Sequence, residues 1–326
     1  MKVAFAGSFA VRLLDAVRPL LSVPCSLLVE EDETAILPRL ADVDVLVSMG
    51  FTAAMAAAAP RLRLVQVPGA GLDRIARDVL GPRTRLANVH GHETAIAEYI
   101  MGAMLALSRS FAAVDGALRR GEWRSQWAVG AAVPALWPEL AGRTLGILGF
   151  GHIGTALARR ALAFDMEVCA VRSRAAAAVP EGLQFLGGPD RLDELLARSD
   201  HVAVTLPLSP ATRNLLDARR LALMKPGAYL VNVARGEVVD EVALYRALTS
   251  GRLAGAAIDV WYRYPVSAEP TPPANRPFHE LPNVLMTPHV SGWTDGMMRA
   301  RAGLIAANIA RTAHGEAPLN EIAPAP

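Results

Sequence analysis

A glycine-rich turn in the middle of the chain has the pattern of a phosphate-binding loop. It reads G-F-G-H-I-G from Gly149, after a short apolar run and before a helical pattern. In this setting Gly149 permits a tight turn, Gly151 lets the backbone approach a pyrophosphate, and Gly154 allows close helix–strand packing. The amides of His152 and Ile153 add the positive end of a helix dipole. The motif predicts a dinucleotide-binding site.

Two arginines bear on which dinucleotide binds. In NAD sites of this kind an acidic residue follows the first glycine by about 20 positions and hydrogen-bonds the ribose 2′-hydroxyl. Here the predicted strand 167–171 ends instead at Arg172, Ser173 and Arg174. A guanidinium matches a 2′-phosphate in charge and in donor geometry. We therefore expect NADP as the preferred cofactor, with NAD as the alternative; the structural alternative is a solvated strand end.

An arginine and a histidine follow two other predicted strands. Arg235 follows 229–233 and precedes a glycine. Its guanidinium has the donors to hold a carboxylate and polarise a carbonyl. His289 follows 284–287 and the rigid Pro288, and imidazole is well suited to proton transfer near neutral pH. The structural alternatives are a surface arginine that caps the next helix and a satisfied structural histidine.

Two further features are candidate sites. The turn Gly69, Ala70, Gly71 follows a predicted strand, and its amides would suit a carboxylate, although a simple tight turn is an equal interpretation. The pair His90 and His92 lacks a further ligand cluster, so we expect no metal site and favour cleft-lining or structural roles.

The composition narrows the class of protein. The chain has 326 residues, 52% hydrophobic and 20% charged, with a net charge of +2. That content suits a large core, and the balanced charge argues against nucleic-acid binding. With only two cysteines and no long apolar run or signal pattern, we expect a cytoplasmic protein that does not insert in membranes.

Short apolar runs alternate with helical patterns along the chain. The runs 3–5, 26–29, 43–48 and 64–67, then 144–148, 167–171, 201–205, 229–233, 255–259 and 284–287, predict strands. Such alternation predicts right-handed βαβ units, parallel sheets and therefore an α/β fold. One long helix is expected over 93–120, an irregular segment over 126–139 and a proline-rich loop over 264–282. A last helix over 294–314 should pack on the first domain.

Several blocks together resemble the D-isomer-specific 2-hydroxyacid dehydrogenase family over nearly the whole chain. Besides the glycine loop, they are V-P-G-A-G-L-D from Val67, L-P-L-S-P-A-T from Leu206, M-K-P-G from Met224, N-V-A-R-G from Asn232, A-I-D-V from Ala257 and T-P-H from Thr287. The resemblance implies two doubly wound parallel-sheet domains. A Rossmann cofactor domain, 101–289, is inserted into a flavodoxin-like substrate domain, 1–100 plus 290–326, with a cleft between them and usually a homodimer.

The resemblance also implies residue roles. Arg235 would hold the substrate carboxylate, with Gly69, Ala70 and Gly71 as further substrate-binding residues. His289 would be the acid in reduction and the base in the reverse reaction. Cofactor-side positions match Pro207, Thr212, Val233 and Asp259, the last with a buried structural aspartate as its alternative.

The chain departs from the family pattern at one position. A glutamate that hydrogen-bonds the catalytic histidine is expected a few residues after Asp259, but the sequence has Tyr264 there. Formate dehydrogenases of the same superfamily also lack this carboxylate. Two hypotheses follow: Tyr264 orients His289 through its hydroxyl, or Glu269 reaches the site from the proline-rich loop.

We expect an NAD(P)-dependent oxidoreductase acting on a small 2-hydroxy or 2-oxo acid. Its partner would be a small carboxylate substrate. The alternatives are a formate- or phosphite-type dehydrogenase, which needs only a small anion pocket, and a catalytically silent NAD(P)-sensing protein. A panel of substrates distinguishes the formate- or phosphite-type dehydrogenase from the main hypothesis. Cofactor binding without turnover would indicate the NAD(P)-sensing protein.

Overall fold

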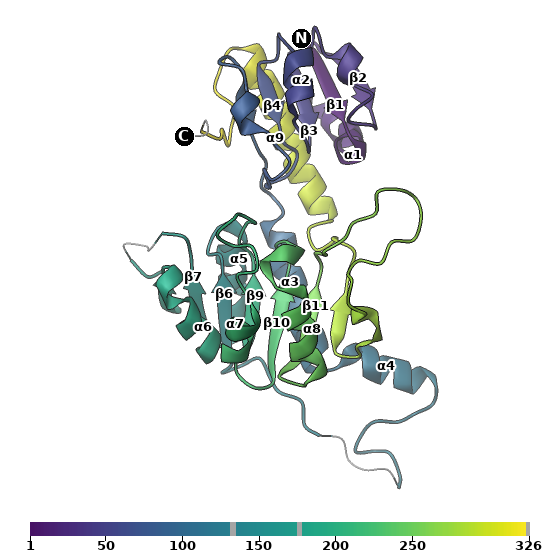
Figure 1. The fold of residues 1–326 in the computed structure, drawn as a ribbon, viewed down its shortest axis with the longest axis vertical. Helices are drawn as coiled ribbons and strands as arrows, with labels where there is room; N and C mark the ends of the chain where they lie inside the picture. The colour runs from purple at the N-terminus through teal and green to yellow at the C-terminus, as the bar shows by residue number, and fades with distance from the viewer. Residues whose placement is uncertain (131–134, 175–177, 324–326) are drawn as a thin grey trace. The chain divides into compact units, whose positions relative to one another are not determined.

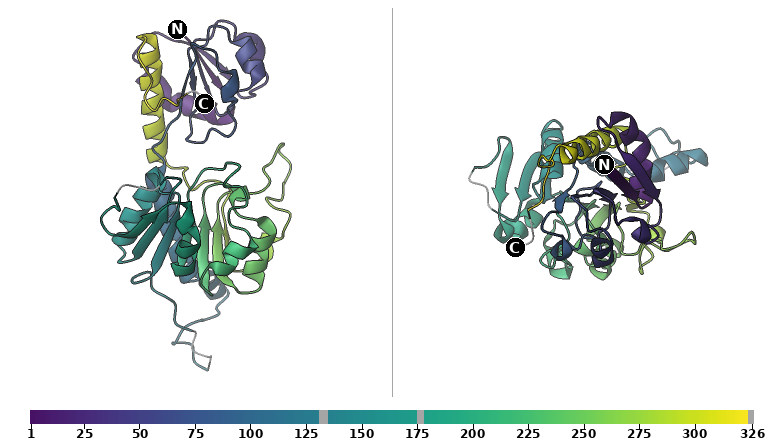
Figure 2. Two further views of the ribbon diagram at one scale, coloured as in Figure 1. Left: turned by 60° about the vertical axis from the view of Figure 1, so that its left-hand side comes forward. Right: turned by 90° about the horizontal axis from the view of Figure 1, so that it is seen from above.

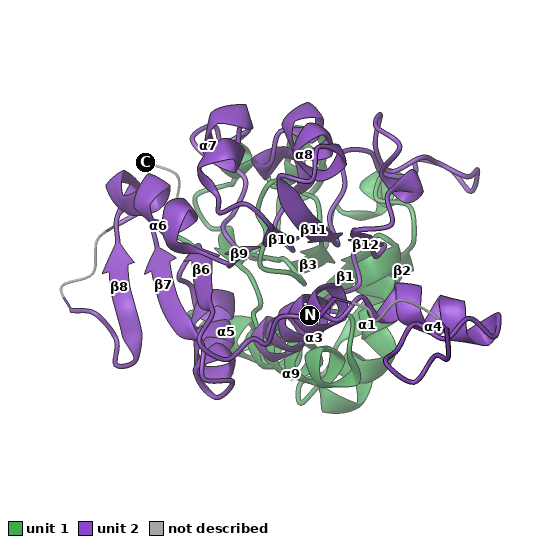
Figure 3. Ribbon diagram, turned by 90° about the horizontal axis from the view of Figure 1, so that it is seen from below, with its two compact units in different colours: residues 1–92, 293–326 green, residues 93–292 purple. Residues whose placement is uncertain are grey.

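The computed structural model describes residues 1–130, 135–174 and 178–323. The chain divides into two compact units, Met1–His92 with Trp293–Pro326, and Glu93–Gly292, coloured green and purple in Figure 3. The domain limits expected from the sequence, 1–100 with 290–326 and 101–289, stay a prediction.

The first unit contains a five-stranded parallel sheet in the order β2-β1-β3-β4-β5. Its strands are β1 (Lys2–Ala6), β2 (Ser26–Glu30), β3 (Val45–Ser48), β4 (Leu64–Gln66) and β5 (Arg85–Ala87). This order is that of flavodoxin-like folds. The first four strands were predicted; β5 was missed because its residues, Arg85–Ala87, form no apolar run.

Alternation along β1 explains how this sheet is covered on both faces. Val3 and Phe5 pack with α1 (Ser8–Val17) and α9 (Asp295–Ala313), whereas Ala4 and Ala6 pack on the face covered by α2 (Ala53–Ala58). Short 3₁₀ turns lie at Arg18–Leu20, Leu37–Arg39 and Arg77–Val79. The last helix, α9, begins after its cap Thr294 and lies beside α1 (Figure 2), so its predicted packing on the first domain is confirmed.

The second unit contains a seven-stranded parallel sheet in the order β12-β11-β10-β9-β6-β7-β8. Its strands are β6 (Thr144–Leu148), β7 (Glu167–Val171), β8 (Leu183–Gly187), β9 (His201–Val204), β10 (Ala228–Asn232), β11 (Leu253–Ile258) and β12 (Val284–Met286). The order reverses direction at β6, as in doubly wound dinucleotide-binding sheets (Figure 1). The predicted α/β fold with two parallel-sheet domains is confirmed.

Helices cover both faces of this sheet. One face packs against α3 (Glu93–Ser108) and α5 (His152–Leu162), through Ile100, Met104 and Leu157. The other packs against α6 (Leu192–Arg198), α7 (Ala218–Leu223) and α8 (Glu241–Thr249). Short 3₁₀ turns lie at Pro189–Arg191, Gly236–Val238 and Phe278–Glu280.

The single helix expected over 93–120 is wrong. Ser110 adopts a left-handed conformation with φ 51°, which separates α3 from α4 (Phe111–Arg119). Its carbonyl accepts the amides of Ala113 and Val114, so a new helix starts at this point. No glycine or proline marks the break, and the sequence therefore gave no signal for it.

The sequence predicted two irregular segments, 126–139 and 264–282, and the structure describes only the second in full. The proline-rich loop 264–282 is irregular apart from the turn Phe278–Glu280, as predicted. Part of the segment 126–139 lies outside the described residues. Among the helices of the described part of the chain, none combines the length and apolarity needed to cross a membrane.

Candidate active site

The glycine loop lies at the carboxyl end of β6 and has room for a phosphate group. Gly149 has φ 104°, and a Cβ there would lie 2.7 Å from the backbone nitrogen of Leu206. A Cβ on Gly154 would lie 2.6 Å from the Gly149 carbonyl oxygen, so α5 packs tightly on the loop. At Gly151, in contrast, no atom lies within 4 Å of the Cβ position, and no side chain caps α5. This open cradle at a helix N-terminus fits a dinucleotide pyrophosphate.

The segment after β9 lies directly against this loop. The Thr205 hydroxyl donates to the Gly149 carbonyl oxygen at 2.8 Å. Further along, the Thr212 hydroxyl donates to the Pro207 carbonyl at 2.8 Å and accepts the Ser209 amide at 2.7 Å. Pro207 and Thr212, predicted as cofactor-side residues, therefore belong to one hydrogen-bonded turn.

The other predicted cofactor residues follow neighbouring strands. Val233 is buried, and its amide bonds the Val204 carbonyl at 3.3 Å. Arg172 is exposed after β7, and its backbone amide donates to Gly187. Because parallel strands end at the same edge, these residues share the sheet edge with the glycine loop.

Arg235 is held in place by its own sequence block. The Asn232 side chain accepts the Ala234 amide at 3.1 Å and donates to the Arg235 carbonyl at 3.0 Å. A Cβ at Gly236 would lie 2.6 Å from the Trp261 backbone, so only glycine fits there. The half-buried Arg235 side chain donates to the Ala234 carbonyl at 2.8 Å. The asparagine and the glycine of N-V-A-R-G thus position its arginine.

His289 occupies a turn that is organised by a buried carboxylate. Asp259 is fully buried at the end of β11. It accepts the amides of Val290 at 2.8 Å and Ser291 at 2.9 Å, and the Thr287 hydroxyl at 2.6 Å. These bonds hold His289 at φ 59°, a left-handed conformation. Asp259 was predicted as a cofactor contact, and that role stays a prediction; its observed contacts position the turn.

Two residues that support this turn were not predicted from the sequence. The Tyr99 hydroxyl lies 2.7 Å from the Thr287 hydroxyl, and the Trp261 indole donates to the Thr287 carbonyl at 2.8 Å. Because Thr287 gives its proton to Asp259, Tyr99 must donate to Thr287. Burial raises the pKa of Tyr99 to about 12, so it remains a donor at neutral pH. Their shared partner Thr287 belongs to the T-P-H block, but no sequence pattern indicated a role for Tyr99.

Tyr264 contacts His289 directly. Its hydroxyl lies 2.8 Å from His289 Nδ1 and accepts the Trp261 amide at 3.3 Å. Glu269, the other candidate, lies on the exposed loop, where its backbone bonds Ser267 and Thr271. The geometry favours the hypothesis that Tyr264 orients His289.

The turn after β4 belongs to the first unit. The Gly69 carbonyl accepts the Val89 amide at 3.2 Å, and the Ala70 carbonyl accepts the Asn88 side chain at 3.0 Å. His90 and His92 have ring centroids 6.5 Å apart. No metal-ligand group of three or more His, Cys, Asp or Glu side chains occurs in the part of the chain that the structure describes.

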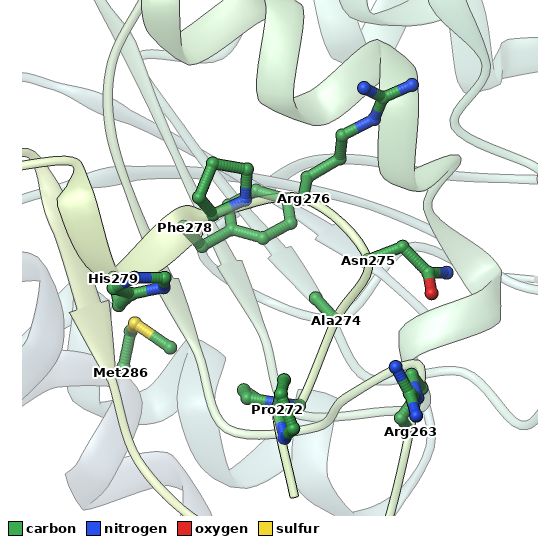
Figure 4. Close-up of a pocket in the computed structure, with 10 residues that line it drawn as sticks. Arg263, Pro272, Ala274, Asn275, Arg276, Phe278, His279 and Met286 are labelled. Carbon is green, nitrogen blue, oxygen red and sulfur yellow. The ribbon is translucent and has the colours of Figure 1, made fainter.

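A separate surface pocket lies on the proline-rich loop. Its volume is about 320 Å³ (Figure 4). Its lining includes Arg263, Pro272, Asn275, Arg276, Phe278 and His279. None of the predicted site residues lines it.

Arg235, Asp259 and His289 follow β10, β11 and β12, three neighbouring strands of the sheet that carries the glycine loop. This arrangement defines a nicotinamide-dinucleotide-dependent dehydrogenase. Residues 101–291 match the family model for the D-isomer specific 2-hydroxyacid dehydrogenase, NAD binding domain. The chain belongs to the D-isomer-specific 2-hydroxyacid dehydrogenase family, as its sequence blocks indicated.

Named relatives agree with this assignment. The chain is 36% identical over 298 residues to a glyoxylate reductase from Thermococcus onnurineus, covering 89% of this chain and 85% of the relative. An NADPH-dependent glyoxylate/hydroxypyruvate reductase from Sinorhizobium meliloti, solved with NADP and sulfate, superposes with a TM-score of 0.80 at 25% identity, covering 98% and 97%. A family member from Xanthobacter autotrophicus, solved with NADPH and MES, gives 0.78 at 27%, covering 99% of each chain.

The expected enzyme class is therefore confirmed. The chain is an NAD(P)-dependent oxidoreductase that transfers hydride between its cofactor and a small 2-hydroxy or 2-oxo acid.

Proposed function

We propose that this enzyme reduces a small 2-oxo acid of the glyoxylate or hydroxypyruvate class with NADPH. The observation that carries the proposal is the placement of Arg235 after β10 and of the Asp259-held His289 after β12, on either side of β11 in the cofactor-binding sheet. The printed activities of the glyoxylate reductase relatives support the substrate class.

In the proposed mechanism each residue has one task. Arg235 binds the carboxylate and polarises the carbonyl through two donors. His289 donates a proton to the carbonyl oxygen, and in oxidation it accepts the proton of the hydroxyl. The turn Gly69, Ala70, Gly71 supplies backbone amides to the carboxylate.

The cofactor site uses the sheet edge described above. Gly149, Gly151, His152, Ile153 and Gly154 would hold the pyrophosphate through the backbone and the helix dipole. The ring side would be bordered by residues that follow β9, β10 and β11, namely Pro207, Thr212, Val233 and Asp259. When bound, the reduced nicotinamide supplies the hydride that the carbonyl carbon receives.

NADP is the proposed preferred cofactor. Arg172 and Arg174 are exposed after β7, where a 2′-phosphate would meet them. The structural neighbours solved with NADPH and NADP support the same choice. A ratio of kcat/KM for NADPH over NADH below one would refute the preference.

A substrate panel tests the proposed reaction. Consumption of NADPH would be followed with glyoxylate, hydroxypyruvate, pyruvate and bulkier 2-oxo acids, and cofactor reduction with formate and phosphite. The proposal expects fastest turnover with the smallest 2-oxo acids. Turnover of formate or phosphite alone would contradict it, and so would tight NADPH binding without any turnover.

We also propose that the enzyme is a homodimer. The helix α4 and the segment after it expose Phe111, Leu118, Trp123 and Trp127, which are 53%, 53%, 61% and 77% exposed. Figure 1 shows α4 standing clear of the seven-stranded sheet. A contiguous apolar surface of this kind is typical of an interface. Light scattering should give twice the chain mass of 34.6 kDa; a monomer at micromolar concentration would refute the proposal.

A cytoplasmic location is the last part of the proposal. Cys25 and Cys169 are both free thiols, which suits a reducing compartment. Cell fractionation with detection of the chain tests this location, and recovery outside the cytoplasm would refute it.

A further inference from the structure

We propose that Tyr264 is the positioning residue for His289 and that its hydroxyl serves both protonation states of the imidazole. The usual glutamate favours the charged imidazole, whereas the Tyr264 hydroxyl can accept from the charged ring or donate to the neutral ring. This inference rests on the proposed role of His289 and concerns the pH range in which each direction of the reaction works.

The hydrogen bonds around the Tyr264 oxygen carry the argument. The Trp261 amide donates to it at 3.3 Å, which occupies one lone pair. One lone pair and the O–H remain for His289 Nδ1 at 2.8 Å. When the imidazole is neutral, the O–H donates to Nδ1 and the ring proton sits on Nε2. When it is charged, Nδ1–H donates to the remaining lone pair. Either state is satisfied without movement of the ring.

The phenol adds no charge to this pair at neutral pH. Partial burial raises the pKa of Tyr264 above its usual value of 10. A glutamate in its place would put a negative charge beside the ring, and an opposite charge at this range typically raises a histidine pKa by about 1–3 units. Tyr264 can orient His289 as the glutamate would, but it cannot supply this electrostatic stabilisation.

Other charged groups surround the pair and stay constant when Tyr264 is replaced. Arg235 and Glu237 follow β10, Asp259 follows β11, and all three act electrostatically on Tyr264. Tyr99 faces the turn from α3 through Thr287, and Arg263 precedes Tyr264 in the loop. The electrostatic effect of these groups on His289 is the same in every variant at position 264, so it cancels when the variants are compared.

The functional consequence has a definite sign. Reduction needs the charged imidazole and oxidation the neutral one. Without a carboxylate partner the charged form is lost at lower pH. The rate of reduction should therefore begin to fall at a lower pH in this enzyme than in a variant with glutamate at position 264, and oxidation of the 2-hydroxy acid should begin at a lower pH than in that variant.

The test compares pH profiles of kcat/KM for glyoxylate reduction with NADPH. The variants are Tyr264→Glu, Tyr264→Gln and Tyr264→Phe. Tyr262→Phe is the matched control, because its hydroxyl bonds the Val239 carbonyl instead of the histidine. We expect Tyr264→Glu to move the alkaline limb up by about one pH unit or more. Tyr264→Phe should lower kcat severalfold, Tyr264→Gln should restore most of it without moving the limb, and Tyr262→Phe should leave the profile unchanged.

A second readout does not depend on turnover. The imidazole of His289 can be titrated by NMR and assigned, among the 7 histidines, by the loss of its signal in His289→Asn. Its pKa should rise in Tyr264→Glu. An unchanged pKa and an unchanged limb in that variant would overturn the proposal, as would wild-type kcat in Tyr264→Phe. Failure of the proposed function is separate, since it would appear as no turnover of glyoxylate or hydroxypyruvate by the wild-type enzyme.

Discussion

At the scale of single residues, the chemistry depends on side chains whose backbone is fixed by their neighbours. Arg235 has its carbonyl bound by Asn232 and is followed by a glycine that nothing larger could replace. Arg235 and His289 were predicted because each follows a predicted strand and stands in a block, N-V-A-R-G or T-P-H, that resembles the family pattern. It could not predict Tyr99, because a tyrosine on a buried helix is most often only a core residue. The sequence could not decide whether Tyr264 or Glu269 contacts His289, because the path of a proline-rich loop depends on how it packs in the folded protein.

The first prediction concerns Arg235. Arg235→Lys keeps the positive charge but loses the planar pair of donors, so we expect kcat/KM for glyoxylate to fall by about tenfold or more, from a loss of roughly 1.5 kcal/mol. Affinity for NADPH, measured by fluorescence, should stay within about threefold. Arg159→Lys, on the exposed side of α5, is the control and should match the wild type. Equal kcat/KM in both variants would exclude a carboxylate-binding role.

The second prediction concerns the cofactor. Arg172→Ala should lower kcat/KM for NADPH by about tenfold while that for NADH changes little, because one charge-assisted contact to the 2′-phosphate is lost. Arg159→Ala removes the same charge from the same unit and controls for general electrostatics. A parallel fall with both cofactors would argue that Arg172 does not contact the 2′-phosphate.

At the scale of elements, the turn 287–291 shows what an α/β sheet contributes to the site. The strands β11 and β12 bring Asp259 and Thr287 together, and the fully buried carboxylate then accepts the bonds that fix His289. The strands on which this turn depends were predicted because they are short apolar runs. The strands β5 and β8 were not predicted, and no glycine or proline marks the break at Ser110. Each of these depends on neighbours distant in the chain.

The third prediction tests this turn. Asp259→Asn replaces an acceptor with a donor that faces buried N–H groups, so the free energy of unfolding should fall by about 1–3 kcal/mol and kcat should fall with it. Asp217→Asn is the control. Asp217 also accepts a backbone amide, that of Arg220 at 2.8 Å, but at the exposed start of α7. Urea unfolding and steady-state kinetics measure both effects. A stable Asp259→Asn variant with wild-type kcat would contradict the positioning role.

At the scale of the whole molecule, more of the fold than of the candidate site could be predicted from the sequence. The alternation of strands and helices and the spacing of the family blocks were enough to predict two parallel sheets. Alternating apolar runs and helical patterns reflect which residues are buried, and burial can be read along the chain. The contacts of Asp259 and Tyr264 required the folded arrangement of three strands and a loop. The free energy of unfolding should also depend on pH, and the amino-acid composition alone does not predict this dependence.

The fourth prediction is the stability of the protein in acid. Burial lowers the pKa of His201, which stacks on Tyr229, to about 4 from 6.5. The unfolded chain therefore binds this proton first, and the stability due to neutral His201 is present above pH 6.5 and is lost as the pH falls toward 4. His201→Phe keeps a stacked ring and should reduce the slope of unfolding free energy against pH by up to about 1.4 kcal/mol per unit in this window. An unchanged slope would refute this assignment.

The most direct test of the central claim is the single-turnover rate of glyoxylate reduction by NADPH-loaded His289→Asn. If His289 supplies the proton to the carbonyl oxygen, the rate should fall by about 10²-fold or more while the dissociation constant for NADPH stays near the wild-type value. A wild-type rate in this variant would show that the proton comes from another group and would contradict the account.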